Sequence, residues 1–232
     1  MSLLSICQDA AEEIGFPAPS SVVGSSDPNA KQLLRFANRE GEELSQATNW
    51  NILVTEGSVT LATGDQDYAL ASDLRWVIPT TTWNRNDKRI VLAPLTSQEW
   101  QFHKAWTTIS GLNLMARIRN NQLEFSQTIS SSENGKVIYY EYVSNKWAST
   151  SGGTAQQLFL LDTDTCRLDE ELVTQGVVWR FKKAKGLDWE GDFQLYKNLK
   201  GKQIARDGDQ RRVRFCGLKS GLGVNVPDQN YG

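Results

Sequence analysis

The sequence predicts an α+β protein in which a four-helix bundle carries an inserted antiparallel β-rich domain and ends in an extended C-terminal arm. Two segments with apolar residues at helical spacing open the chain, and two more stand near its end. Between them, short runs of β-branched and aromatic residues alternate with turn residues. We expect residues 1–52 and 166–207 to form the bundle, residues 53–165 the β-rich domain and residues 208–232 the arm.

The two N-terminal helices have recognisable ends. Ser2 can cap the first helix, whose apolar residues fall on one face, and Gly15 stops it. Asp27 followed by Pro28 is a favourable N-cap and first helical residue for the second helix. Gly41 lies on the apolar stripe of that helix, at a cost in helix propensity. We therefore expect another helix to approach closely at Gly41.

The central region is expected to form an antiparallel β domain. Its strands are predicted at residues 57–64, 68–70, 74–83, 89–92, 114–118, 123–125 and 136–143. Asn120 and Asn121 tolerate the positive φ of a tight hairpin turn between two of these strands. One helix interrupts the domain, because the segment from Thr96 to Glu99 fits a capping box. Residues 144–157 are predicted to be a polar loop.

Two further helices are expected after Leu168. Acidic residues fill the first turn of the earlier one and basic residues its last turns, which matches the helix dipole, and Gly186 ends it. The later helix starts near Asp188. Its expected buried side consists of Trp189, Phe193, Tyr196 and Leu199. These two helices can complete a four-helix bundle with the N-terminal pair.

Sequence signals of catalysis and of cofactor binding are mostly absent. It contains no GxGxxG, P-loop, GxSxG or HExxH motif. Its single histidine, His103, and three widely spaced cysteines argue against a metal centre. Asp162-Thr163-Asp164 resembles the start of a calcium loop, but the required glycine and final glutamate are absent. We expect a protein that is not an enzyme and has no cofactor or metal.

The composition is that of a soluble globular protein. Hydrophobic residues make up 39% of the chain and charged residues 22%. No stretch approaches the roughly 20 apolar residues that a membrane-spanning helix needs, and no signal peptide is expected at the N-terminus. We therefore expect that the protein does not contact a membrane. We also expect that it is made in a cytoplasm and leaves it only as part of a particle.

The charges are distributed unevenly along the chain. Residues 1–179 contain 13 Lys and Arg against 21 Asp and Glu, a balance of −8, whereas residues 180–232 contain 12 against 6, a balance of +6. The C-terminal part could therefore bind an acidic surface, while the rest would repel polyanions. After Gly208 the sequence becomes rich in glycine. This segment cannot bury enough surface by itself to become ordered without a partner.

Two other functions remain open at this stage. The chain has eight tryptophans, and aromatic faces can stack on sugar rings, so a glycan-binding module of a tail or receptor-binding protein is the alternative. Five of them fall in the β-rich region: Trp76, Trp83, Trp100, Trp106 and Trp147. The arginines near residue 212 could instead bind phosphates, as in a DNA-binding packaging accessory.

Several phrases, taken in order, resemble the head-to-tail adaptor proteins of tailed phages, including the tail tubular A type of short-tailed phages. They are Trp83, Ala93-Pro94-Leu95-Thr96-Ser97-Gln98-Glu99-Trp100-Gln101, Asp162-Thr163-Asp164, Leu168-Asp169-Glu170-Glu171-Leu172, Gly176-Val177-Val178-Trp179-Arg180 and Ala184-Lys185-Gly186-Leu187-Asp188. The resemblance extends over roughly residues 1–207 and implies a helical bundle carrying a β domain.

The resemblance also implies a function without catalytic residues. It implies a virion structural protein at the head–tail interface, assembled in the host cytoplasm as a ring of twelve copies between the portal protein and the tail nozzle or tubular protein. Genomic double-stranded DNA would pass through the channel of the ring without specific binding. We expect the isolated subunit to be monomeric or weakly associated. Residues 208–232, with Arg211, Arg212, Arg214 and Phe215, are our candidate for an arm that binds the portal.

Overall fold

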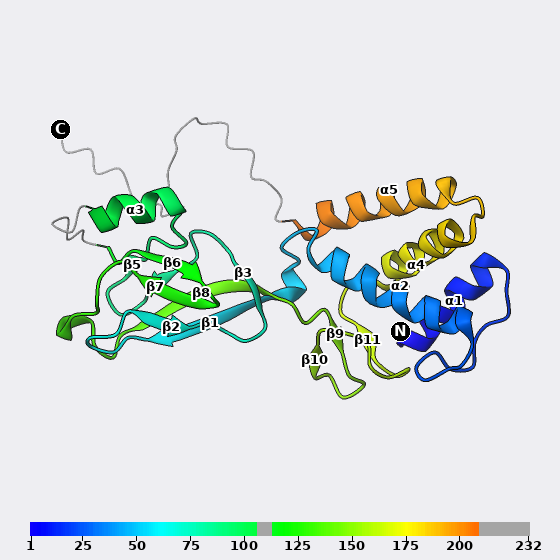
Figure 1. The fold of residues 1–232 in the computed structure, drawn as a ribbon, viewed down its shortest axis with the longest axis horizontal. Helices are drawn as coiled ribbons and strands as arrows, with labels where there is room; N and C mark the ends of the chain where they lie inside the picture. Colours follow the sequence, from blue (N-terminus) through cyan, green and yellow to red (C-terminus); the bar gives the residue numbers. More distant parts are fainter. Residues whose placement is uncertain (106–112, 209–232) are drawn as a thin grey trace, which may run out of the picture.

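The structure is a computed structural model that describes residues 1–105 and 113–208. It confirms an α+β fold with antiparallel sheets. Figure 1 shows a mainly helical part at one end of the molecule and the longer strands, with a further helix beside them, at the other. The elements in chain order are α1 (Leu3–Ile14), α2 (Pro28–Ser45), η1 (Asn51–Leu53), β1 (Val54–Thr60), β2 (Asp67–Ala69), β3 (Leu74–Val77), β4 (Trp83–Asn84), β5 (Arg89–Ile90), α3 (Ser97–Ala105), β6 (Ala116–Arg119), β7 (Gln122–Phe125), η2 (Ser131–Glu133), β8 (Val137–Ser144), β9 (Ala148–Ser149), β10 (Ala155–Gln156), β11 (Thr165–Cys166), α4 (Glu170–Lys185) and α5 (Glu190–Asp207).

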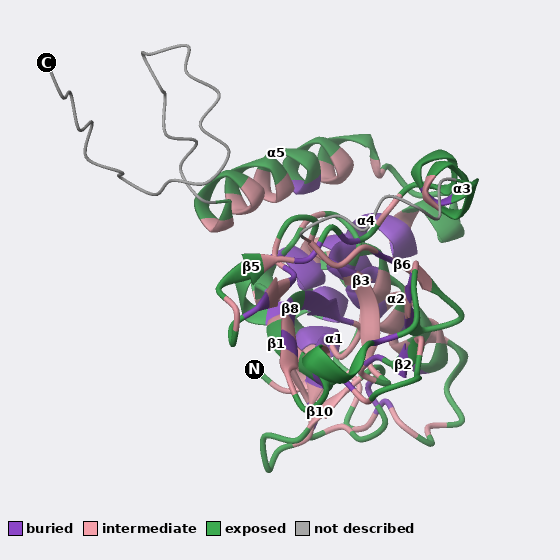
Figure 2. Ribbon diagram, turned by 90° about the vertical axis from the view of Figure 1, so that its left-hand side faces the viewer, coloured by how far each residue is buried: buried purple, intermediate pink, exposed green. Residues whose placement is uncertain are grey.

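The helical body consists of α1, α2, α4 and α5, and its central helix is α4, which contacts the other three. Most of α4 between Leu172 and Phe181 is buried, whereas α5 buries only Tyr196 (Figure 2). Trp189, Phe193 and Leu199, which were expected to be buried as well, are half-buried because α5 packs mainly on α4. The four predicted helices are therefore present and in contact. The finer prediction, a four-helix bundle, is not confirmed by this arrangement.

The predicted helix ends are confirmed. The Ser2 hydroxyl accepts a hydrogen bond from the backbone of α1, and the Asp27 carboxylate does the same for α2. Gly15 and Gly186 end α1 and α4 with φ of 93° and 71°, a left-handed conformation that glycine adopts without strain. In α3, Thr96 and Glu99 form the expected capping box, and each accepts a hydrogen bond from the backbone N–H of the other.

The sheet body is built around β8. This strand pairs with β1 from Val137 to Val143, and on its other edge with β3 and β4, to give a five-stranded antiparallel sheet. A second sheet has the order β2-β7-β6. Its β6–β7 hairpin turns at Asn120 and Asn121, with φ of 51° and 57°, as predicted. The side chains between the two sheets form a hydrophobic core that includes Phe125, Ile138 and Tyr140.

The helical body has its own hydrophobic core, and the chain after β8 contributes to it. Val143, Trp147 and Phe159 are buried among the helices, although they fall within the range predicted for the inserted domain. The division into domains at residues 53 and 165 stays a prediction. Residues 144–157, predicted to be a polar loop, contain β9 and β10, which form a small sheet in the order β10-β9-β11.

The expectation of a close helix at Gly41 is wrong. A side chain at this position would overlap the ring of Trp147, which lies between β8 and β9 and is fully buried. The Trp147 ring packs edge-on against Phe159 at a centroid distance of 4.8 Å. Gly41 therefore makes room for an aromatic ring instead of a helix backbone. The sequence did not predict this contact, because the polar residues around Trp147 indicate a loop.

The alternate carboxylates of the loop before β11 are engaged by the chain itself. Asp162 accepts hydrogen bonds from the Ser21 hydroxyl at 2.7 Å and from the N–H groups of Val22 and Val23, at 3.1 and 2.8 Å to the nearer oxygen. Asp164 is fully buried and accepts from the N–H groups of residues 160 and 161 and from the side chain of residue 156. These carboxylates therefore hold loops in place.

We expect Asp162→Asn to destabilise the protein by about 1–2 kcal/mol near pH 7, because charge-assisted hydrogen bonds are lost. Burial opposes ionisation of Asp162, but the hydrogen bonds from Val23, Ser21 and Val22 outweigh it and hold its pKa below the ordinary value. A lowered pKa in the folded state stabilises the fold above the ordinary pKa, and this contribution is lost as the pH falls through the folded value. Urea midpoints should therefore differ more near pH 7 than near pH 3.

The exposed Asp65 makes no side-chain hydrogen bond within the described residues, so Asp65→Asn serves as a control with a change below about 0.5 kcal/mol. If the urea midpoints of the wild type and of Asp162→Asn differ by the same amount at both pH values, this role of the carboxylate is contradicted.

Candidate interaction surfaces

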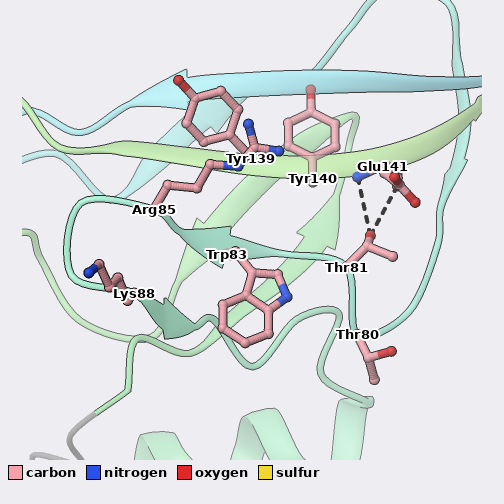
Figure 3. Close-up of a pocket in the computed structure, with 8 residues that line it drawn as sticks. All are labelled: Thr80, Thr81, Trp83, Arg85, Lys88, Tyr139, Tyr140 and Glu141. Carbon is pink, nitrogen blue, oxygen red and sulfur yellow. Dashed lines mark hydrogen bonds between the residues drawn. The ribbon is translucent and has the colours of Figure 1, made fainter. Parts of the chain in front are cut away.

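A groove of about 520 Å³ lies on the outer face of the five-stranded sheet (Figure 3). It is lined by Thr80, Thr81, Trp83, Arg85, Lys88, Tyr139, Tyr140 and Glu141. The alternation of β8 explains the side on which Tyr139 and Glu141 lie, because successive side chains point to opposite faces of a sheet. Ile138, Tyr140 and Tyr142 belong to the core between the sheets. Tyr139 and Glu141 therefore point to the opposite, outer face.

An aromatic surface with a cationic rim results. Trp83 on β4 is the register partner of Tyr139 on β8, so the two residues are cross-strand neighbours. The Arg85 guanidinium lies 3.9 Å from the centre of the Tyr139 ring and forms an ion pair with Glu56 of β1. Lys88 is exposed at the rim. This arrangement suits a flat or weakly anionic group and contains no nucleophile paired with a base.

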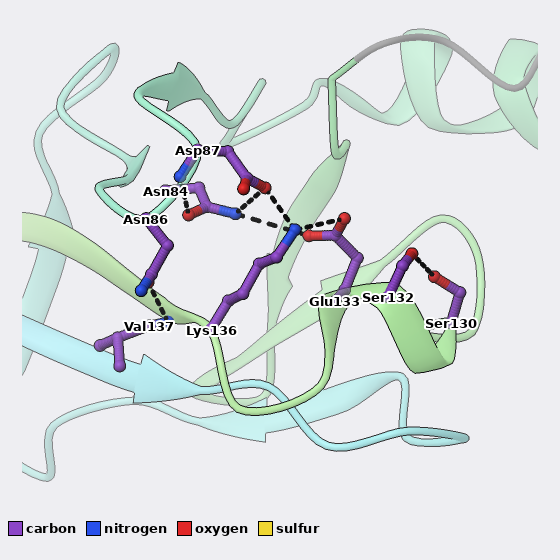
Figure 4. Close-up of polar contacts among 8 residues, drawn as sticks. All are labelled: Asn84, Asn86, Asp87, Ser130, Ser132, Glu133, Lys136 and Val137. Atoms are coloured by element: carbon purple, nitrogen blue, oxygen red, sulfur yellow. Dashed lines mark hydrogen bonds and ion pairs between the residues drawn. The ribbon is translucent and has the colours of Figure 1, made fainter.

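The turn beside this groove is held by an ion-pair cluster (Figure 4). The Lys136 ammonium donates to Asp87 at 2.6 Å and to Glu133 at 2.9 Å, and the Asn84 amide donates to Asp87 at 3.0 Å. The hydrogen bonds to Asp87 and Glu133 raise the pKa of Lys136. Because the lysine is matched by two carboxylates, we interpret the cluster as a support for the β4–β5 turn.

The tryptophans of the β-rich region do not gather at one site. Trp100 and Trp147 are 2% and 0% exposed, and Trp76 donates its indole N–H to Asn49. Trp106 lies outside the described residues. Of the others only Trp83 lines the groove. The burial of Trp100 and Trp147 removes two of the residues on which the glycan hypothesis depended.

The predicted arm residues Arg211, Arg212, Arg214 and Phe215 also lie outside the described residues, so their role stays a prediction.

Sequence reasoning missed a buried ionic cluster that joins three helices. Glu40 of α2 is fully buried and accepts from the Arg180 guanidinium of α4 at 2.7 Å and from the Tyr196 hydroxyl of α5 at 2.6 Å. Arg180 also donates to Glu43 at 2.6 Å. Burial raises the pKa of Glu40, while Arg180 and Tyr196 oppose that rise. The one signal in the sequence was a glutamate on the apolar stripe between Ala37 and Leu44.

In the described part of the chain, no group of acidic, histidine and cysteine side chains is arranged to hold a metal ion. None of the helices described is both long and apolar enough to span a membrane.

Comparison with protein families places the chain beside phage adaptor proteins. A protein-family model described as SU10 adaptor protein matches residues 1–215, which include both the helical and the sheet body. No curated protein matches the chain. The match supports the resemblance to a phage adaptor that the sequence motifs indicated. It does not support the narrower assignment to the tail tubular A type.

Proposed function

Because the chain belongs to the SU10 adaptor protein family, we propose that it is the head-to-tail adaptor of a tailed phage, a structural protein located in the virion. The main support for this proposal is the family match across residues 1–215. In finer terms, we propose that twelve copies form a ring at the head–tail interface. This ring joins the portal protein to the tail nozzle after assembly in the host cytoplasm, and the genomic DNA passes through its channel.

The distribution of charge supports a channel role. Residues 1–179 carry a balance of −8, which disfavours adhesion of a polyanion such as DNA. We propose that the protein acts by binding its neighbours and not by catalysis. The groove at Trp83 and Tyr139 fits this proposal, because its lining offers contact area without an acid–base pair.

Electron microscopy of the purified protein mixed with portal rings tests the proposal. We expect an added layer of protein on one side of the portal, whereas sedimentation of the protein alone should show monomers or weak association. Portal rings that remain bare at micromolar protein concentrations would contradict the adaptor function.

The C-terminal arm provides a further prediction. Deletion of residues 208–232 should weaken portal binding at least about tenfold, which corresponds to about 1.4 kcal/mol, because an arm that orders on binding would be lost. The triple variant Arg211→Ala, Arg212→Ala, Arg214→Ala should show a smaller loss that disappears at high salt.

Both arm variants should keep the urea midpoint of the full chain, since the helices and strands of the described residues all lie before residue 208. If deletion leaves portal binding unchanged, the arm does not bind the portal.

A further inference from the structure

One face of the helical body is basic. Lys31, Arg35 and Arg39 stand four residues apart on the exposed side of α2 and line a groove of about 480 Å³ with Pro28, Gln32 and Phe36. Like charges at this spacing destabilise a helix by a few tenths of a kcal/mol per pair. Arg39 forms an ion pair with Glu43, but Lys31 and Arg35 have no ion-pair partner within the described residues. The helix therefore carries unmatched positive charge at some cost to itself.

A second face is acidic. The lining of a groove of about 460 Å³ between α1 and the start of α4 includes five carboxylates, those of Asp9, Glu13, Asp169, Glu170 and Glu171. Three of the carboxylates have partners: Glu170 pairs with the terminal ammonium, Glu13 accepts from a glutamine side chain, and Asp169 caps α4. Asp9 and Glu171 are exposed and have no hydrogen-bond or ion-pair partner among the described residues.

The two faces are separate surfaces of the helical body. At 3.6 residues per turn, the cations of α2 stand opposite its buried residues, which include Leu33, Ala37 and Leu44. The buried residues of α1, including Ile6 and Ala10, belong to the same hydrophobic core. The basic groove is lined by residues of α2 alone and the acidic groove by residues near α1 and at the start of α4, so the two grooves share no lining residue.

We propose that the α2 face with Lys31 and Arg35 docks on the α1/α4 face with Asp9 and Glu171 of a second copy of this chain. This inference rests on the proposed function, in which the copies form a ring. One basic and one acidic face on each subunit give a head-to-tail contact, the kind that closes into a ring when the rotation between copies allows it. DNA would match the basic face equally well but would leave the acidic face without a partner. A second copy accounts for both faces.

Charge reversal on each face provides the test. In K31E/R35E the α2 face becomes acidic, so both faces of this variant are acidic. In D9K/E171K the α1/α4 face gains positive charge, while the α2 face stays basic. Each variant alone should load onto portal rings at least about tenfold less than the wild type, since like charges then oppose each other across the contact. An equal mixture of the two should load to within about twofold of the wild type, because alternating copies restore opposite charges at every contact.

K197E/K202E is the matched control for K31E/R35E, because it makes the same change in net charge on the exposed side of α5. It should load like the wild type, and the urea midpoints of all variants should show that each is folded. Normal loading of K31E/R35E, or a mixture that loads no better than its components, would overturn the proposal. If instead K31E/R35E loses retention of duplex DNA and the mixture forms no rings, DNA is the occupant and the proposal is wrong. Wild-type protein that ignores portal rings would overturn the proposed function, and this interface with it.

Discussion

Arg180→Met is expected to lower the free energy of unfolding by about 3–5 kcal/mol, the loss typical of removing one partner of a buried ion pair. The variant leaves the fully buried Glu40 carboxylate with the Tyr196 hydroxyl as its remaining partner. For a chain of this size the melting temperature should fall by about 2–4 °C per kcal/mol. Urea or thermal unfolding followed by circular dichroism measures both values.

A second substitution separates the unpaired charge from the loss of packing. Glu40→Gln combined with Arg180→Met removes both buried charges and keeps an oxygen that can accept from Tyr196. We expect the double variant to recover about 2 kcal/mol relative to Arg180→Met alone. Arg39→Ala is the matched control, because Arg39 pairs with Glu43 at the surface and should contribute below about 1 kcal/mol. A double variant less stable than Arg180→Met would contradict the assignment of the loss to a buried charge.

Trp147→Ala should destabilise the protein by about 3–5 kcal/mol, because a fully buried ring is replaced by a cavity. The cavity would lie between Gly41 of α2 and Phe159, which the indole ring now contacts on two sides. Denaturant unfolding measures the change. Trp83→Ala serves as the control in the sheet body, where the half-exposed ring lines an open groove and should contribute about 1 kcal/mol.

The contact between Gly41 and Trp147 gives this prediction a second readout. Gly41→Ala should destabilise the wild type, because the added methyl group overlaps the Trp147 ring. In the Trp147→Ala background the ring is absent, so only the difference in helix propensity remains. There Gly41→Ala should stabilise the protein by up to about 1 kcal/mol. Gly201→Ala in α5, where a side chain meets open space, should stabilise both backgrounds equally. Equal effects of Gly41→Ala with and without Trp147 would show that the ring does not require glycine there.

Local signals predicted much of the fold correctly. Ser2, Asp27, Gly15 and Gly186 mark helix ends through hydrogen bonds and dihedral angles that involve only a few neighbouring residues. The β6–β7 turn and the capping box of α3 are equally local. The family resemblance also came from short motifs in a fixed order, and the family match supports it. The domain division and the arm stay predictions.

Contacts between distant segments could not be predicted in this way. Glu40 meets Arg180 and Tyr196 across 140 and 156 positions, and the partner of Gly41 comes from beyond the sheet body. The groove at Trp83 and Tyr139 depends on the register between β4 and β8. The acidic face of the helical body could be found only from the structure, because it combines residues near α1 with residues at the start of α4.

By itself, the amino-acid sequence determined several of the helix ends of this protein, its α+β class, and the family that its motifs resemble. The tertiary structure alone decided which buried charges pair, which ring fills the space at Gly41 and which faces stay exposed. Capping, turn formation and periodicity act within about one helical turn, so each segment specifies them for itself. Packing and charge pairing depend on the path of the whole chain, which brings together side chains that no local pattern relates.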